Sequence, residues 1–540
     1  MHETAHCMCR CAPEEPFLNK KFRCRALAYV GVALALLTGS YPALAADPSA
    51  PVALAPAGRF IGSTESNGIL SFKGIRYAAA PTGKLRWQAP RLTQRNREAV
   101  DATAYGPACL QPAPARAAPA TSEDCLFLNV WTPDLDRAQR RPVMVWIHGG
   151  GFRTGSGRLP GEVLAAGDVV VVSMNYRLGP LGFMAHEALP NRTANFGLLD
   201  MIAALDWVQG NIRSFGGDPT NVTIFGLSAG GQAVNLLMVS PQAKRKFHRA
   251  IAQSGYATWA LPRTRRAPAP APKSATLGVA ESAESLSAAV IAAVQKKPQT
   301  TELLYSLDGQ TLVEAVRGFQ LPIVDGDSLP EEPGILFMRG RQAAVPFTTG
   351  GNSFEGSVMP ESGITKEMLE QILGEELPAL RAAYADDFAV SDTLGVARIF
   401  GDYRYLLSSR LLAHSMDTVN AGGWLYYTDL AAAQRPAGQP GTPHGYDFVL
   451  LFDTDRTASP STRELGARMR RHWLAFARHG RPDVEGLAPW PAIEDSAEEW
   501  MVFGRADGPR RRVLAEKIDL LERNYRRRVT PLYNRAPIGP

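Results

Sequence analysis

One serine lies in a short glycine-rich segment whose residue types could carry chemistry. Residues 226–230 read Gly-Leu-Ser-Ala-Gly; they follow the β-branched and aromatic run 221–225 and precede the apolar segment 232–240, which has helical spacing. A serine in a sharp turn between a strand and a helix has its hydroxyl exposed at the edge of a sheet, and the neighbouring glycines leave room for the strained backbone. The N–H groups at the start of the helix point toward that hydroxyl. The segment therefore predicts that Ser228 is a nucleophile.

A serine hydroxyl needs a base, because almost none of it is ionised at neutral pH. The second half of the chain contains four histidines: His414, His444, His472 and His479. Two of them fall in segments with helical spacing, and His479 falls at the expected end of a helix, where its charge complements the helix dipole. His444 instead lies between a proline and a glycine, in a loop after the predicted strand 424–430. Since catalytic residues of α/β sheets gather in loops beyond strand ends, we predict that His444 is the base.

A carboxylate must orient the histidine, and four carboxylates are candidates: Glu355, Asp325, Asp327 and Asp447. Glu355 follows the predicted strand 344–350 in a loop that contains glycine, a setting that mirrors that of Ser228. Asp447 is the candidate nearest to His444 in the chain. The Asp-Gly pair at Asp325 is also typical of a simple turn. We therefore expect Glu355 to complete the triad, in the chain order serine, acid, histidine.

Acyl transfer also requires hydrogen-bond donors for the developing oxyanion. Residues 148–151 read His-Gly-Gly-Gly after a predicted buried strand and upstream of the serine. Glycines allow backbone N–H groups to point inward with no side chain in the way. We predict an oxyanion hole formed by the N–H groups of Gly150, Gly151 and Ala229. A flexible glycine turn is the alternative.

These residues require a sheet that brings distant segments together. The runs 142–150 and 168–177 are nearly continuously apolar, which is typical of central strands covered on both faces. Apolar residues recur at helical spacing over 195–217, and the pattern stops at a pair of glycines suited to a helix C-terminus. Further strands are predicted at 221–225, 249–255, 344–350 and 424–430. The alternation predicts an α/β fold whose central sheet is mostly parallel and flanked by helices, with 262–300 as a surface excursion that runs into a helix.

The first 45 residues resemble a secretory signal peptide. Four basic residues at 20–25 precede the apolar run 26–37, and a small-x-small cleavage site follows at Ala45. The apolar run is too short for a membrane anchor, which needs about 20 apolar residues. We expect cleavage near Ala45, export to the periplasm or the medium, and one domain over 46–540, with no stable membrane insertion of the mature chain. The true translation start could lie downstream of Met1.

Removal of this segment leaves two cysteines, Cys109 and Cys125. In an exported chain, two cysteines separated by 16 positions most simply form a disulfide. A pair of buried free thiols is the alternative.

The composition is that of an ordinary globular protein, with 45% hydrophobic and 20% charged residues. A formal net charge of +6 over 540 residues does not indicate nucleic-acid binding. The basic run 523–529 near the C-terminus is expected to be a solvated terminal helix, with a basic surface patch as the alternative.

The sequence resembles the type B carboxylesterase family of α/β-hydrolases over roughly residues 55–505. The resemblance is carried by segments such as "SEDCLFLNVWTP", "VMVWIHGGGF", "NYRLGPLGF" and "GGDPTNVTIFGLSAGG". It implies an α/β-hydrolase fold, a triad completed by Glu355 and His444, an N-terminal disulfide between Cys109 and Cys125, and no metal or organic cofactor. The segment 360–440 looks shorter than in larger family members, so substrate specificity cannot be transferred.

The leading hypothesis is a serine carboxylesterase that acts on a small-molecule ester. The alternatives are an inactive binding or adhesion protein on the same scaffold, and a hydrolase of amides, carbamates or lipids. Four aromatic residues are candidates to line an apolar cleft, although each is also explained by core packing: Phe152, Trp259, Phe354 and Phe448. The sequence does not indicate the oligomeric state.

Overall fold

A computed structural model describes residues 49–112, 120–189, 193–267, 282–493, 498–504 and 507–534. The predicted signal peptide, residues 1–45, lies outside the described residues. The described residues from Ser49 onward belong to one compact unit. None of their helices is both long enough and apolar enough to cross a membrane.

The main sheet of the described chain has 11 strands in the order β16-β15-β14-β13-β12-β11-β9-β10-β8-β4-β3. The parallel strands are β9 (Arg141–Ile147), β10 (Val170–Met174), β11 (Gly217–Leu227), β12 (Arg249–Gln253), β13 (Phe347–Asn352), β14 (Gly423–Asp429) and β15 (Glu499–Gly504). Antiparallel strands complete both edges: β3 (Ser63–Thr64), β4 (Leu70–Arg76) and β8 (Phe127–Thr132) at one, β16 (Gly508–Arg511) at the other. The α/β prediction is confirmed, while the antiparallel edges were not predicted.

The central strands are apolar on both faces because both faces are covered. In β9, Val143, Val145 and Ile147 enter one hydrophobic cluster, whereas Met144 and Trp146 enter another. Side chains alternate between the faces of a strand, so these two clusters are the two layers of core on either side of the sheet.

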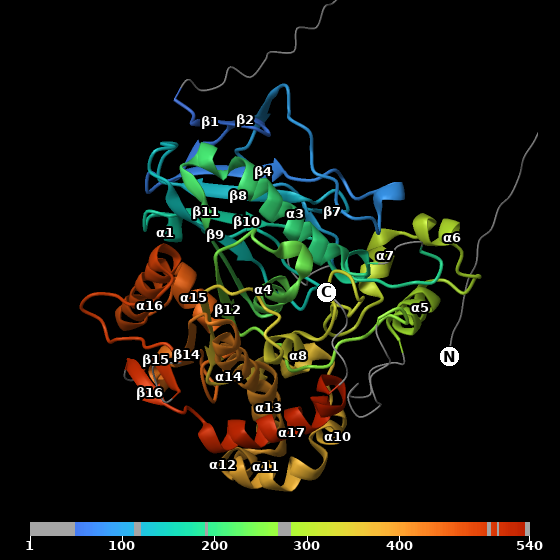
Figure 1. The fold of residues 1–540 in the computed structure, drawn as a ribbon, viewed down its shortest axis with the longest axis vertical. Coiled ribbons are helices and arrows are strands. Elements are labelled where there is room, and N and C mark those ends of the chain that lie inside the picture. The colour runs from blue at the N-terminus through green and yellow to red at the C-terminus, as the bar shows by residue number, and fades with distance from the viewer. Residues whose placement is uncertain are drawn as a thin grey trace, which may run out of the picture. The chain divides into compact units, whose positions relative to one another are not determined.

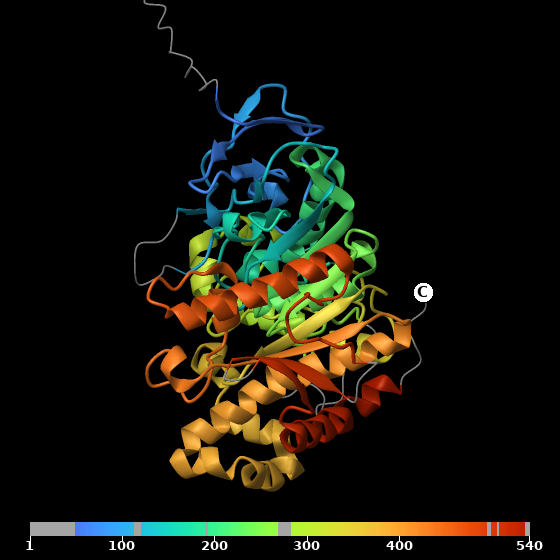
Figure 2. The same ribbon diagram turned by 90° about the vertical axis from the view of Figure 1, so that its left-hand side faces the viewer.

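Helices from distant parts of the chain form the two covering layers. The first cluster includes side chains of α3 (Phe196–Asn211) and α4 (Ala229–Val239), and the second includes those of α15 (Tyr446–Phe452) and α16 (Pro460–His479). In Figure 1, α3 and α4 (green) lie on the other side of the sheet from α15 and α16 (orange-red). Figure 2 shows α16 lying across the sheet. The turn that carries Ser228 is therefore held between two packed layers.

The remaining elements surround this core. The short strands are β1 (Val52–Ala55), β2 (Gly58–Ile61), β5 (Ala99–Asp101), β6 (Ala108–Cys109) and β7 (Thr121–Ser122). The other helices before His444 are α1 (Glu162–Ala165), α2 (Gly179–Gly182), α5 (Ala283–Val294), α6 (Thr301–Ser306), α7 (Gly309–Glu314), α8 (Pro333–Met338), α9 (Met359–Ser362), α10 (Lys366–Leu373), α11 (Leu377–Ala383), α12 (Ala385–Val390), α13 (Asp392–Gly401) and α14 (Leu407–His414). The last helix is α17 (Ala515–Tyr533).

Most sequence predictions agree with these bounds, with local differences. The helix predicted over 195–217 ends at Asn211 and continues as a 3₁₀ turn to Gly216, whose φ of 79° is left-handed. The strand predicted over 142–150 ends at Ile147, so the glycines after it form a loop. Part of the predicted excursion 262–300, residues 268–281, lies outside the described residues, and α5 is the helix into which it runs.

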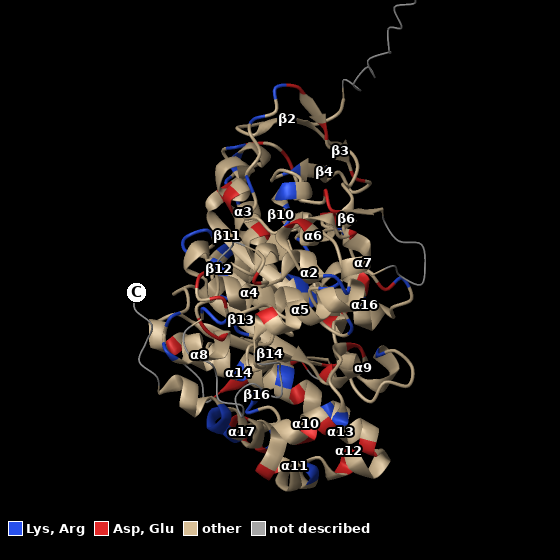
Figure 3. Cartoon of the chain, turned by 90° about the vertical axis from the view of Figure 1, so that its right-hand side faces the viewer, with Lys and Arg blue, Asp and Glu red and all other residues tan. Residues whose placement is uncertain are grey.

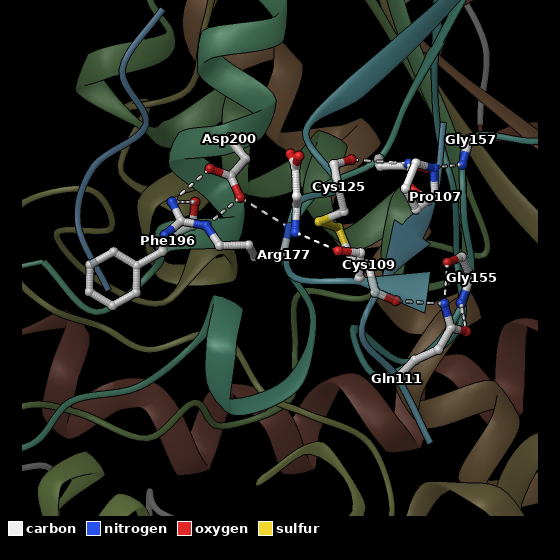
Figure 4. The surroundings of a disulfide bond; sticks show 12 residues. Pro107, Cys109, Gln111, Cys125, Gly155, Gly157, Arg177, Phe196 and Asp200 are labelled. Atoms are coloured by element: carbon white, nitrogen blue, oxygen red, sulfur yellow. Dashed lines mark hydrogen bonds and ion pairs between the residues drawn. A yellow bond between two sulfur atoms is a disulfide. The ribbon is translucent and has the colours of Figure 1, made fainter. Parts of the chain in front are cut away.

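The predicted disulfide between Cys109 and Cys125 is present, with a Cα–Cα distance of 4.9 Å. The Asn175 side chain donates to the carbonyls of Pro107 and Cys125 at 2.9 and 3.1 Å, and it accepts from the N–H of Gly157 at 2.8 Å. Figure 4 shows Pro107 and Gly157 beside the disulfide. The cross-link therefore belongs to a network that fixes the segment following the glycine loop.

The basic run near the C-terminus lies in α17, and two of its arginines pair with acidic residues. Arg526 pairs with Glu522 at 2.7 Å, and Arg527 pairs with Glu375 at 2.6 Å. Figure 3 shows acidic and basic residues interspersed over α17 and the neighbouring α10 to α13. The Arg526 pair lies within α17 and the Arg527 pair joins α17 to the segment after α10, which agrees with the expectation of an ordinary terminal helix.

Candidate active site

Ser228 occupies a strained corner between β11 and α4. Its φ of 59° and ψ of −120° are rare for a residue with a side chain. The N–H of Ser228 donates to the carbonyl of Gln253 on the adjacent β12 at 2.8 Å, and this hydrogen bond helps to fix the corner. A Cβ on Gly226 or Gly230 would lie 2.6 or 2.0 Å from the Ile147 carbonyl oxygen of β9. The two glycines are therefore required by the close approach of a neighbouring strand as well as by the turn.

His444 and Glu355 are joined by a direct hydrogen bond. The Nδ1 of His444 donates to Oε2 of Glu355, which is fully buried at the carboxyl end of β13. The other oxygen of Glu355 accepts from Ser254 Oγ at 2.6 Å and from the backbone N–H and side-chain amide of Asn352 at 2.6 and 3.1 Å. These donors occupy Oε1 and leave Oε2 for the imidazole, so the carboxylate fixes both the tautomer and the plane of the ring.

The second nitrogen of the imidazole is available for proton transfer. His444 Nε2 is buried and has no hydrogen-bond partner among the described residues. The N–H of His444 donates to Ser357 Oγ at 2.9 Å, and its ring lies 4.7 Å from that of Tyr405. His444 and Ser228 line the same cavity, although no hydrogen bond joins their side chains in this structure. Such contacts are commonly loose without substrate and tighten when it binds.

The other carboxylates considered from the sequence have different partners. Asp447 accepts from Tyr426 OH at 2.6 Å and from Gln253 Nε2 at 3.1 Å, and burial raises its pKa. Asp325 accepts from Asn195 Nδ2 at 3.2 Å and from Ser328 Oγ at 2.7 Å within a buried turn. Asp327 is exposed. The described hydrogen bonds connect none of the three to His444, whereas they connect Glu355 to it.

The glycine loop presents unused N–H groups. Gly150 and Gly151 have φ values of 99° and 62°, and among the described residues their N–H groups donate no hydrogen bond to another protein atom. A Cβ on Gly151 would lie 2.3 Å from the Phe319 ring. Ala229 is the first residue of α4, directly after Ser228, and is fully buried. Both glycines line the cavity with Ser228, as an oxyanion hole requires.

His148, at the start of the glycine loop, is a neutral structural residue. Its ring stacks on Tyr176 at 4.2 Å, and its Nδ1 donates to the carbonyl of Gly149 at 2.9 Å. Burial lowers its pKa to about 4. The imidazole is therefore uncharged near neutral pH, and it supports the loop without adding charge to the cavity.

The cavity has a volume of about 690 Å³. Its lining is Gly149, Gly150, Gly151, Arg153, Thr154, Leu227, Ser228, Arg317, Gly318, Phe319, Val358, Pro360, Glu361, His444 and Gly445. The four aromatic residues proposed from the sequence as a cleft lining are not in this set; Phe152, Trp259 and Phe354 are buried in the core, and Phe448 packs on Trp146 at 5.3 Å. Phe319 is the aromatic residue that contributes to the wall.

Sequence reasoning missed the residues that hold the triad and line the cavity. Asn352 is the last residue of β13 and Ser357 follows Glu355 by two residues, so their polar character close to a candidate acid was an available signal. Ser254 follows β12, a strand that was predicted. Arg317 and Phe319 follow α7 and are far from every motif, so nothing local indicated them. Among the described residues, no group of three or more His, Cys, Asp or Glu side chains could hold a metal ion.

Comparisons with known proteins show the family of the chain. A model of the carboxylesterase family matches residues 49–520. The fumonisin B1 esterase of Sphingopyxis macrogoltabida is 35% identical over 469 residues, covering 81% of this chain and 84% of that protein. The para-nitrobenzyl esterase of Bacillus subtilis is 34% identical over 472 residues, covering 83% of this chain and 93% of that protein.

Solved structures show the same fold. A PNB esterase structure superposes with a TM-score of 0.74 at 31% identity, covering 88% of this chain and 99% of the other. A carboxylesterase of Geobacillus stearothermophilus superposes with a TM-score of 0.74 at 27% identity, covering 87% and 99%. The chain thus belongs to the carboxylesterase family and is an enzyme that hydrolyses carboxylic esters on an α/β-hydrolase fold.

Proposed function

We propose that this enzyme cleaves esters through an acyl-enzyme intermediate on Ser228. The serine oxygen attacks the ester carbonyl while its proton passes to Nε2 of His444, and the imidazolium then protonates the leaving alcohol. Water, deprotonated by the same nitrogen, then attacks the acyl-enzyme. The bond from the acyl carbon to Ser228 Oγ breaks, the imidazolium returns its proton to that oxygen, and the acid is released. One observation carries the proposal: the Nε2 of His444 has no hydrogen-bond partner among the described residues. The side chain of His444 lines the same cavity as Ser228.

Glu355 orients the base in this mechanism. Its Oε2 accepts from Nδ1 of His444 and stabilises the imidazolium that forms during each proton transfer. Ser254 and Asn352 act as positioning residues, because their hydrogen bonds to Oε1 keep the carboxylate from turning away.

Backbone N–H groups stabilise the tetrahedral intermediate. The unused N–H groups of Gly150 and Gly151, with that of Ala229 at the start of α4, are the donors for the developing oxyanion. Loss of one such donor commonly costs about 100- to 1,000-fold in kcat.

The esterase names of the relatives favour hydrolysis over an inactive binding role. Amides, carbamates and lipids share the same acyl chemistry, so the triad does not separate them from simple esters. A panel of nitrophenyl esters of graded acyl length, with the matching anilides, separates these substrate classes.

The test compares Ser228→Ala with Ser306→Ala, an exposed serine at the end of α6. We expect Ser228→Ala to lower kcat by about a thousandfold or more and Ser306→Ala to leave it unchanged. Mass spectrometry after treatment with a fluorophosphonate should find the adduct on the peptide that contains Ser228. A loss in Ser228→Ala of less than about a hundredfold would contradict nucleophilic catalysis by this residue.

We further propose that the chain is exported after removal of residues 1–45 and acts as a single domain over 46–540. The support is the leader-like sequence together with the disulfide, since disulfides persist in oxidising compartments. Mass spectrometry of the protein from fractionated cells should find a mature chain that begins near Ala46 outside the cytoplasm. A full-length cytoplasmic chain with reduced cysteines would contradict this assignment.

A further inference from the structure

Three charged side chains line the cavity: Arg153, Arg317 and Glu361. Arg153 follows the glycine loop by two residues, and its backbone N–H donates to the carbonyl of Gly150 at 3.0 Å. Arg317 lies after α7, and Glu361 is an exposed residue of α9. The wall therefore carries two positive charges against one negative charge.

Neither lining guanidinium is neutralised by the protein. Among the described residues, Arg153 and Arg317 form no ion pair, and the half-buried Arg153 has an Nε that is shielded from water and lacks a partner. Several arginines elsewhere in the fold are paired with carboxylates: Arg141 with Asp134, Arg177 with Asp200 and Arg410 with Glu498. Arg317 is exposed. Because a desolvated donor without a partner costs free energy, the unpartnered Nε of Arg153 on the cavity wall indicates a group that arrives with the substrate.

Both arginines are tied to the loop that is proposed to bind the reacting carbonyl. The N–H of Gln320 donates to the carbonyl of Gly151 at 2.9 Å, and this bond joins the segment that contains Arg317 to the glycine loop. Phe319 lies against Gly151, where a Cβ would be 2.3 Å from its ring. A charge bound by Arg153 and Arg317 is therefore bound in a fixed relation to Ser228.

A third cation adds to the positive character of this wall. The fully buried guanidinium of Arg404 packs on the ring of Tyr256 at 4.0 Å and lies 5.6 Å from the ring of Phe319. It forms no ion pair with a carboxylate of a described residue. Its charge therefore acts on the cavity through a ring of low polarity.

We propose that the preferred substrate is an ester that carries a carboxylate besides the scissile ester group, and that Arg153 and Arg317 bind this carboxylate. The proposal rests on the proposed function, since it names the substrate class of the same site. Planar guanidinium groups match a carboxylate with paired N–H donors, and such charge-assisted hydrogen bonds are the strong ones. The exposed Glu361 offsets one of the positive charges of the wall, which disfavours substrates with several anionic groups.

Two matched ester pairs test the proposal. Ethyl hexanoate is compared with monoethyl adipate, in which a carboxylate replaces the terminal methyl group of the acyl chain. Phenyl hexanoate is compared with 4-(hexanoyloxy)benzoate, in which the carboxylate lies on the alcohol side. The variants are Arg153→Gln, Arg153→Lys, Arg317→Gln and Arg317→Lys. Arg213→Gln is the control. Arg213 is an exposed arginine that precedes the amino end of β11, whereas Ser228 follows the carboxyl end of the same strand.

We expect the wild-type enzyme to prefer the anionic member of at least one pair. Each Gln variant should lower kcat/KM for that ester by about tenfold or more relative to kcat/KM for its neutral partner, chiefly through KM. The Lys variants should retain an intermediate preference, and Arg213→Gln should match the wild type. Equal effects of the Gln variants on anionic and neutral esters would overturn the proposal.

A binding measurement separates this proposal from the proposed function. Monoethyl adipate, 4-(hexanoyloxy)benzoate and their neutral partners are titrated calorimetrically into Ser228→Ala, with and without Arg153→Gln. If either anionic ester binds more tightly than its neutral partner, and Arg153→Gln abolishes the difference, the proposal is supported. This result supports it even if Ser228→Ala retains turnover and the nucleophile assignment fails. Equal binding of anionic and neutral esters overturns it even if the nucleophile assignment is correct.

Discussion

Gln111 holds both backbone groups of Gly155, since its Nε2 donates to the Gly155 carbonyl at 2.9 Å and its Oε1 accepts from the Gly155 N–H at 2.9 Å. Gln111 stands two residues after Cys109, and Gly155 stands four residues after Gly151. The disulfide segment and the proposed oxyanion loop are thereby joined through one side chain, as Figure 4 shows. The segment that begins at the disulfide thus contacts the loop directly.

Gln111→Ala should lower kcat by about tenfold with little change in KM, because a loosened glycine loop misplaces its N–H groups in the transition state. Steady-state kinetics on a nitrophenyl ester measures the effect. Gln139→Ala is the control, since Gln139 is exposed and bonds only with the neighbouring Asp136 among the described residues. An unchanged kcat in Gln111→Ala would show that the loop holds its position without this contact.

Glu355→Gln and Asp447→Asn separate the two buried carboxylates near His444. Glu355→Gln should lower kcat by about a thousandfold or more, since the amide no longer stabilises the imidazolium. Asp447→Asn should mainly lower the free energy of unfolding, because Asp447 accepts hydrogen bonds from Tyr426 and Gln253 and has no described contact with His444. Kinetics on the folded fraction of each variant, with denaturant unfolding in parallel, tests the difference. Comparable losses of kcat in both variants would assign the orienting role to the pair.

Gly230→Ala and Gly210→Ala should change stability in opposite directions. A Cβ at Gly230 would lie 2.0 Å from the Ile147 carbonyl oxygen. We therefore expect Gly230→Ala to lower the free energy of unfolding by about 1–3 kcal/mol or more and to abolish activity. A Cβ at Gly210, inside α3, meets nothing within 4 Å, so alanine there should stabilise by about 0.5–1 kcal/mol. Denaturant unfolding measures both. A fully stable and active Gly230→Ala variant would contradict the close approach of β9 to the corner.

Asp402 should make stability depend on pH. Burial raises its pKa from 3.8 to about 6, and Tyr384 OH donates to its Oδ2 at 2.8 Å. Since the folded state holds this proton more tightly than the unfolded chain, the contribution of Asp402 to the unfolding free energy is largest at low pH. It is lost as pH rises from about 4 to about 6.

Asp402→Asn removes this titration. The free energy of unfolding of the wild type, relative to that of the variant, should therefore fall as pH rises from about 4 to about 6 and stay level at higher pH. Unfolding curves of both proteins between pH 4 and 8 provide the measurement. A difference that stays constant over this range would mean that Asp402 titrates alike in both states.

Several features of this enzyme were predictable from local sequence. The corner at Ser228 requires small neighbours at fixed spacing, and that requirement is visible in a five-residue segment. The apolar runs of β9 and β10 indicated strands covered on both faces, and the two core clusters confirm this. His444 was separable from the helical histidines because proline and glycine flank it.

The remainder depended on contacts between distant segments. Glu355 follows a strand end, and Asp447 lies close to His444 in the chain, so both were candidates to orient the histidine. Only the packing of β13 against β14 gives the bond from His444 Nδ1 to Glu355 and the bond from Tyr426 to Asp447. The charged cavity wall has the same origin, since Arg153 and Arg317 are brought together by the Gln320–Gly151 bond across 169 residues of chain. A strained turn or a two-sided strand is encoded by steric demands within a few residues, so the sequence by itself predicted a nucleophile at Ser228 and determined the central strands. The partner of a carboxylate and the charge of a cavity depend on which side chains packing places within a few ångströms, and only the tertiary structure decided those.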